Sequence, residues 1–149
     1  MPVLRHKNGK LFFDHAQLVS DAIQFSYLSE EGTAGDAQVF LQDYTAFADN
    51  QILLLEDIGS ESAEIVTVNG TPTVNGGAIL DSVLVRSHPV GSTVYIIDFN
   101  QIELTHATTA TGSKTALTLN SGIVSIQPDI AIQVYNETEF SSGYYFARY

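Results

Sequence analysis

Short apolar runs of about 4–8 residues, separated by glycine, asparagine, proline and aspartate, follow one another along most of this 149-residue chain. Val, Ile and Thr, whose branched side chains suit pleated strands, supply 37 of the residues. The pattern predicts an all-β fold, a single small β-sandwich or β-barrel domain of short antiparallel strands with an extended N-terminal arm. Strands are expected at about 22–28, 38–42, 51–56, 63–69, 78–84, 92–99, 101–106, 115–119, 122–127, 131–135 and 143–149.

Residues 14–21 have no clear period, and residues 1–21 are interpreted as the N-terminal arm, followed by a β domain at 22–149. The arm contains the turn signal Lys7-Asn8-Gly9-Lys10 and then the apolar Leu11-Phe12-Phe13. A short helix capped by Asp14 and Gln17 is the alternative for the residues that follow. Alternation at 23–27 instead favours a strand, which we expect to form a hairpin with 38–42.

The chain carries six basic and 17 acidic residues, for a formal net charge of −11. Nucleic-acid binding replaces counterions with Lys and Arg, so no nucleic-acid partner is expected. The charge is uneven, because residues 1–10 carry +3, from Arg5, Lys7 and Lys10, and residues 11–149 carry −14. A short basic arm on an acidic body can dock on a complementary surface. The competing interpretation is a frayed, solvated terminus.

The sequence contains no cysteine, which excludes a disulfide scaffold. No apolar stretch reaches the roughly 20 residues that cross a bilayer, and the N-terminus lacks the apolar core of a secretory signal. We therefore expect no membrane partner, and a soluble, unprocessed chain synthesised in the cytoplasm.

Motifs for catalysis or metal binding are missing from the sequence. The four histidines, His6, His15, His88 and His106, are isolated from one another, so no transition-metal spacing occurs. We expect no catalytic residues, no metal and no cofactor. Acidic residues do gather at Glu56, Asp57, Glu61 and Glu64, where oxygen ligands could hold calcium. The alternation of Glu64 with Ile65 in a strand instead favours a solvent-exposed Glu64 side chain.

The chain ends on an aromatic strand, residues 143–149. Alternate side chains of a strand face opposite sides, so one aromatic side meets solvent or another subunit. Because an exposed aromatic edge promotes aggregation, we expect a covered edge in a homo-oligomer. The residues expected at that subunit interface are Tyr144, Tyr145, Phe146 and Tyr149.

Several stretches of residues 50–149 resemble a group of tailed-bacteriophage virion proteins. They are Ile52 to Val68 (ILLLEDIGSESAEIVTV), His88 to Tyr95 (HPVGSTVY), Asp98 to Leu104 (DFNQIEL), Ala107 to Gly112 (ATTATG) and Ser142 to Tyr149 (SGYYFARY). In that group these hairpins and turns recur in this order, often in longer chains with further domains. The resemblance implies a non-enzymatic role in the particle and carries no catalytic residues.

The short, acidic, cysteine-free domain with a basic arm is most similar to a capsid decoration (cement) protein. The implied partner is the major capsid protein, and the implied location is the capsid surface of the virion. The residues expected to bind the capsid are Arg5, Lys7, Lys10, Leu11, Phe12 and Phe13. The alternatives are a phage tail, baseplate or neck (head–tail connector) protein, and a carbohydrate-binding adhesive β module whose tyrosines stack on sugars. An enzyme is the least favoured class.

Overall fold

The computed structural model describes residues 3–15, 24–118, 122–140 and 142–148. Within these ranges the chain is all-β, as its sequence predicts, and all the strand pairs are antiparallel. The strands are β1 (Val3–Lys7), β2 (Lys10–Asp14), β3 (Phe25–Tyr27), β4 (Gln38–Phe40), β5 (Ile52–Leu55), β6 (Glu64–Thr67), β7 (Gly77–Ile79), β8 (Thr93–Ile97), β9 (Gln101–Ala107), β10 (Thr115–Ala116), β11 (Ile123–Ser125), β12 (Ile132–Asn136) and β13 (Tyr144–Arg148).

A four-stranded sheet with the order β3-β8-β5-β6 holds the most apolar segments of the chain. Both of its faces are covered. Leu53 and Leu55 of β5 belong to one cluster of buried side chains, whereas Leu54 between them belongs to a second. Because successive residues of a strand point to opposite faces, a strand buried on both faces must be apolar throughout. This requirement explains the uninterrupted apolar run at 52–55.

The first cluster joins this sheet to the two-stranded sheet β4-β7. The predicted hairpin between 22–28 and 38–42 forms only at one end, because β3 pairs with β8 and β4 pairs with β7. Leu28 and Leu41, which directly follow these strands, form an antiparallel bridge, and the amides of Ser29 and Gln42 donate to the carbonyls of Phe40 and Tyr27 at 2.9 Å. The loop between the two strands is bonded to the segment before β8: the Gly32 amide donates to the His88 carbonyl, and the His88 amide donates to the Gly32 carbonyl.

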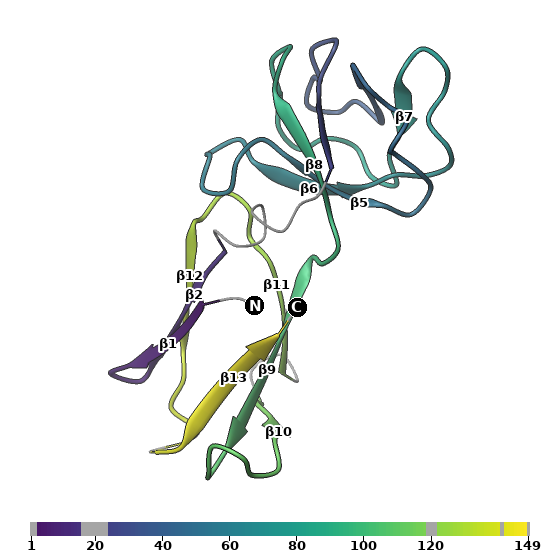
Figure 1. The fold of residues 1–149 in the computed structure, drawn as a ribbon. Coiled ribbons are helices and arrows are strands. Elements are labelled where there is room, and N and C mark those ends of the chain that lie inside the picture. The colour runs from purple at the N-terminus through teal and green to yellow at the C-terminus, as the bar shows by residue number, and fades with distance from the viewer. Residues whose placement is uncertain (1–2, 16–23, 119–121, 141, 149) are drawn as a thin grey trace.

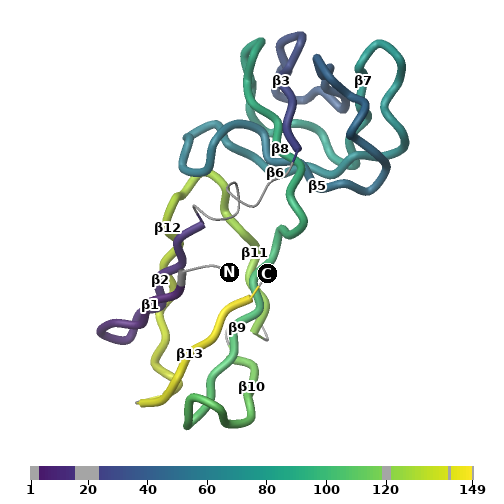
Figure 2. Tube along the Cα trace, viewed as in Figure 1, coloured from purple at the N-terminus to yellow at the C-terminus, as the bar shows by residue number. Residues whose placement is uncertain are grey.

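The second cluster lies among two further sheets and the other face of the β3-β8-β5-β6 sheet. One is three-stranded, β1-β2-β12, and the other has the order β10-β9-β11 with β13 also paired to β9. Leu11 of β2, Leu104 of β9 and Val124 of β11 are all buried in this cluster. We call residues 25–97, which contain the strands from β3 to β8, the β3–β8 part. Figures 1 and 2 show the two further sheets in the lower half of the view, below the β3–β8 part, and the chain passes from β8 directly into β9.

The arm expected at residues 1–21 is revised for the residues that the structure describes. Residues 3–14 form a hairpin, and β2 pairs with β12 from Ile132↔Asp14 to Asn136↔Lys10. Leu11 and Phe13 are 0% exposed. The hairpin is therefore part of the folded core. The alternative helix after Asp14, and the start of the strand predicted at 22–28, lie outside the described residues.

Candidate partner-binding face

The β1–β2 hairpin turns at Asn8 and Gly9, which have φ angles of 52° and 68°. Positive φ at both central residues is the geometry of a type I′ turn, for which Asn-Gly is a favoured pair. This tight turn fixes the register, so that Arg5 lies opposite Phe12 and Lys7 lies opposite Lys10. Alternate residues of β2 then face opposite sides, with Leu11 and Phe13 buried and Phe12 half-exposed.

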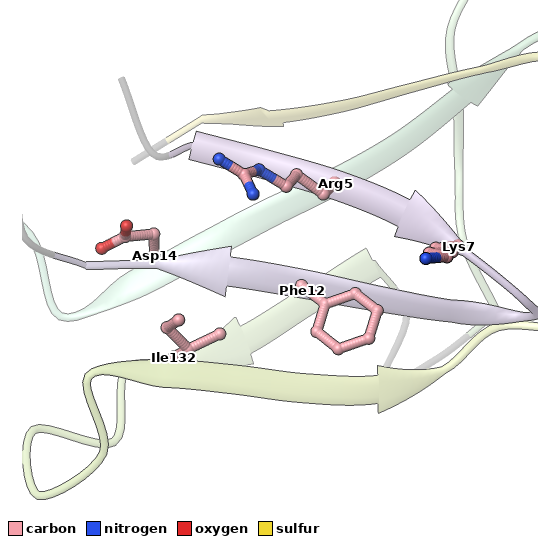
Figure 3. A pocket seen from close by; sticks show the side chains of 5 residues that line it. All are labelled: Arg5, Lys7, Phe12, Asp14 and Ile132. Carbon is pink, nitrogen blue, oxygen red and sulfur yellow. The ribbon is translucent and has the colours of Figure 1, made fainter.

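The outer face of the β1-β2-β12 sheet combines cationic and apolar side chains, and we call it the hairpin face. Its central row runs from Arg5 through Phe12 to Val134, and the flanking rows place Asp14 beside Ile132 and Lys10 beside Asn136. A hollow of about 270 Å³ opens on this face. Its lining residues are Arg5, Lys7, Phe12, Asp14 and Ile132. In Figure 3 the Phe12 ring reaches toward β12, with Arg5 and Lys7 on the β1 side.

The positive charges of the hairpin face have no ion-pair partner among the residues that the structure describes. Lys7 and Lys10 are directly opposite each other, an arrangement that destabilises an antiparallel pair. The other basic side chains are engaged, because Arg86 bonds to Asp129 at 2.9 Å, Arg148 pairs with Glu103, and Lys114 lies 4.2 Å from the centre of the Phe146 ring. A local cost of this kind, retained on an acidic protein, is typical of a binding surface.

Four of the six residues expected to bind a partner lie together on the hairpin face: Arg5, Lys7, Lys10 and Phe12. Leu11 and Phe13 do not, because their side chains fill the core on the other side of the sheet. Sequence reasoning missed Ile132 and Val134 of β12, which are 49% and 48% exposed. Their alternation with buried Gln133 was visible in the sequence, but the pairing of β12 with β2 was not.

The aromatic strand β13 pairs with β9 and also lies against β1. Tyr145 faces inward, where its ring stacks on His6 at 4.4 Å and its hydroxyl donates to the carbonyl of Phe140 at 3.2 Å. Phe146 is half-buried under Lys114, and Tyr144 is 51% exposed. Of the expected interface residues, Tyr144 is therefore the one most open to a second subunit, and Tyr149 lies outside the described residues.

His88 lies in the interior between two carboxylates. Its Nδ1 is 2.8 Å from Oε1 of Glu56, and its Nε2 is 2.7 Å from Oε1 of Glu64. Glu64 also accepts hydrogen bonds from the backbone amides of Val85 and Arg86. The His88 side chain is 0% exposed, and those of Glu56 and Glu64 are 16% and 10% exposed. The prediction of a solvent-exposed Glu64 is wrong.

The electrostatics of this cluster favour a charged imidazolium between two carboxylates. Burial alone would lower the pKa of His88, but hydrogen bonds to Glu64 and Glu56, together with their charges, raise the pKa above its usual value. Burial alone would raise the pKa of each glutamate. Hydrogen bonds from Ser62, His88 and Ser60 nevertheless lower the pKa of Glu56, and those from His88 and the two backbone amides lower that of Glu64.

Both ring nitrogens of His88 are occupied by this ion cluster, so neither is available to remove a proton from a substrate. The geometry instead joins the end of β5, the start of β6 and the segment that precedes β8. Of the four acidic residues considered for calcium, Glu56 and Glu64 already bond to His88, to two serine hydroxyls and to backbone amides. Among the described residues, no group of three or more His, Cys, Asp or Glu side chains is arranged so that it could hold a metal ion.

Two further histidines are buried. His106 stacks on Phe140 with a ring separation of 3.7 Å, and its Nε2 donates to the carbonyl of Ser142 at 2.9 Å. His15 Nε2 bonds to the side-chain oxygen of Gln133, and burial lowers the pKa of His15 despite that bond and the nearby charge of Asp14. Both rings therefore serve packing at the places where their strands end.

Comparisons with known proteins add no relative to this description. No protein-family model matches the chain, and a search of curated proteins finds no match. In the parts of the chain that the structure describes, no helix has the length and apolar character needed to cross a bilayer.

Proposed function

We propose that the chain is a non-enzymatic structural protein of a tailed-bacteriophage virion. On this proposal it is a decoration or cement protein that binds the major capsid protein on the outside of the head. The virion class rests on the resemblance of residues 50–149 to phage virion proteins. The observation that carries the binding role is the hairpin face, where three cations with no ion-pair partner in the described part of the chain lie beside exposed apolar side chains of β12.

The distribution of charge supports docking through this face. Residues 24–100 contain eleven of the 17 acidic residues and one of the six basic residues, Arg86. Three of the other basic residues belong to the hairpin. A partner with a negative surface is therefore attracted at the hairpin face and repelled by the β3–β8 part. An apolar side chain of the partner can fill the hollow beside Phe12, and this fit raises the specificity of binding.

Repetition on a symmetric shell makes a modest interface sufficient. A face of three short strands is small beside the roughly 800 Å² per partner of a standard stable interface. A closed shell offers many identical sites, and subunits that also contact each other bind with a raised effective concentration. We include a homo-oligomer in the proposal, with exposed Tyr144 at the contact, and sedimentation equilibrium of the purified chain measures it.

The experiment that tests the proposal reverses the charge of the hairpin face. The variant Arg5→Glu/Lys7→Glu/Lys10→Glu alters three exposed side chains and keeps the core residues of the hairpin. We expect wild-type protein to bind purified heads that lack it, and the variant to bind at least tenfold more weakly. Deleting residues 1–13 is a poorer test, because it removes core residues Leu11 and Phe13.

The matched control is Lys114→Glu, which reverses one charge on the sheet that contains β13. It should bind heads like the wild type, and circular dichroism should show that both variants are folded. Equal binding by the triple variant would overturn the docking role of the hairpin face. Cryo-electron microscopy of the particle then counts the chain: hundreds of copies fit a decoration protein, whereas six or twelve would reassign it to a tail, baseplate or neck ring.

A further inference from the structure

An aromatic patch lies on the β3-β8-β5-β6 sheet, where β3 forms its edge. Phe25 and Tyr27 of β3 are 55% and 41% exposed. Phe25 is paired with Tyr95 of β8, and the three rings contact one another in sequence, with centroid separations of 5.7 Å and 6.3 Å. Large aromatic side chains exposed as a group on one face are uncommon and mark a binding surface.

A polar hollow adjoins these rings. It measures about 340 Å³, a size within the range of small-molecule sites. Its lining residues are Glu56, Asp57, Ser60, Ser62, Pro89, Gly91, Ser92 and Thr93. Thr93 is the cross-strand partner of Tyr27, and Tyr95 donates its hydroxyl to Asp57 at 2.6 Å. The aromatic rings thus lie beside the hydroxyl-lined hollow.

Within the hollow, the polar groups divide into those already used and those still open to a ligand. Glu56 is committed to His88 and to the Ser60 and Ser62 hydroxyls. Asp57 is exposed, and one of its two oxygens accepts the Tyr95 hydroxyl, so further acceptor capacity faces the solvent. The hydroxyls of Ser92 and Thr93 can both donate and accept.

We propose that this hollow and its aromatic rim form a binding site for a neutral carbohydrate. A sugar ring has an apolar face of C–H groups, which packs on an aromatic ring, and a rim of hydroxyls, which bond to carboxylates and hydroxyls. Phe25 and Tyr27 supply the rings, and Asp57 with the hydroxyls of the hollow supplies the polar partners. Uronic and sialic acids are excluded, because residues 24–100 are strongly acidic.

This site is separate from the hairpin face and does not depend on the proposed virion role. Its test is an NMR titration of the isolated chain with cellotriose, maltotriose and chitotriose, and with trigalacturonate as the acidic control. We expect at least one neutral trisaccharide to shift the amide signals of Tyr27, Asp57 and Thr93, and trigalacturonate to shift none. Tyr27→Ala and Phe25→Ala should each weaken binding about tenfold, the loss of one stacked contact.

The control is Phe12→Ala, which removes a comparable ring from the hairpin face and should leave sugar binding unchanged. Because Phe25 and Tyr27 are exposed, their variants lose only contacts with neighbouring rings and should stay folded, with a melting temperature within about 8 °C of the wild type. The proposal is overturned if no neutral trisaccharide shifts these signals up to its solubility limit, if trigalacturonate binds equally well, or if Tyr27→Ala binds like the wild type. Loss of self-association in Tyr27→Ala without any sugar binding would reassign the patch to a protein contact.

Discussion

Replacing His88 with alanine removes the cation that joins Glu56 to Glu64 in the interior of the molecule. Each of the two hydrogen bonds is charge-assisted, and such bonds contribute about 1.5–3 kcal/mol. Removing one member of a buried ion cluster leaves carboxylates without their counter-charge, at a cost of about 3–5 kcal/mol. Glu64 is the more deeply buried of the two, so it bears most of this cost. We expect the free energy of unfolding to fall by about 3–5 kcal/mol.

The pH dependence of stability follows from the directions of the pKa shifts. The pKa of His88 is raised in the folded state, so its contribution is complete below the ordinary value of 6.5 and is lost as the pH rises through the folded pKa. The pKa values of Glu56 and Glu64 are lowered, so their contributions are complete above 4.5 and are lost as the pH falls. The cluster therefore stabilises most between pH 4.5 and 6.5.

Urea denaturation at several pH values measures both effects, with thermal melting as a second probe. A loss of 3–5 kcal/mol corresponds to a fall in melting temperature of roughly 6–20 °C for a chain of this size. The control is His6→Ala, in which an exposed imidazole loses one stacking contact with Tyr145, worth about 1 kcal/mol. A His88→Ala variant within 1 kcal/mol of the wild type, or one with an unchanged pH profile, would refute the reasoning.

Two further predictions concern the turn of the hairpin and the acidic loop. Gly9→Ala places a side chain at a φ of 68° and should lower the free energy of unfolding, measured by urea denaturation, by about 1–2 kcal/mol. Asparagine tolerates left-handed backbone angles better, so Gly9→Asn should lose less. Addition of EDTA should leave the melting temperature unchanged, because oxygens of Glu56 and Glu64 are already bonded within the chain; a clear fall would restore the calcium interpretation.

Local patterns in the sequence predict the strands of this fold better than their partners. The runs at 52–55 and 93–97 are recognisable because both faces of their sheet are buried. The same burial of both faces makes the prediction for Glu64 of β6 wrong, because Ile65 faces the second cluster and Glu64 faces the side of the first. Alternation implies that one of two neighbours is exposed, and here neither is, so the position of Glu64 could not be read from its neighbours.

The candidate sites depend on contacts between distant residues. The Asn8-Gly9 turn is visible in the sequence, and so is the cluster of basic residues around it. That the hairpin joins β12, and so places Ile132 and Val134 beside Phe12, depends on a pairing across more than a hundred residues. His88 likewise meets Glu56 and Glu64 across 32 and 24 residues. Periodicity carries no information about such contacts.

The segregation of charge has a consequence for how fast the chain approaches an acidic partner. At about 0.01 M salt, where the Debye length is about 30 Å, the net charge of −11 repels the whole molecule from an acidic partner while the two are still well apart, whereas the hairpin face attracts only at close approach. Added salt screens the long-range repulsion first, because the face and its partner are closer than about 8–10 Å when they dock. The association rate with heads should therefore rise or stay level as salt increases from about 0.01 M to 0.1 M, and fall at higher salt. In the triple charge-reversal variant the net charge and the hairpin face are both repulsive, so its association rate should rise over the whole salt range. Stopped-flow light scattering measures the association rates of the wild type and the variant. A steep fall in the wild-type rate from the lowest salt upward would contradict this reasoning.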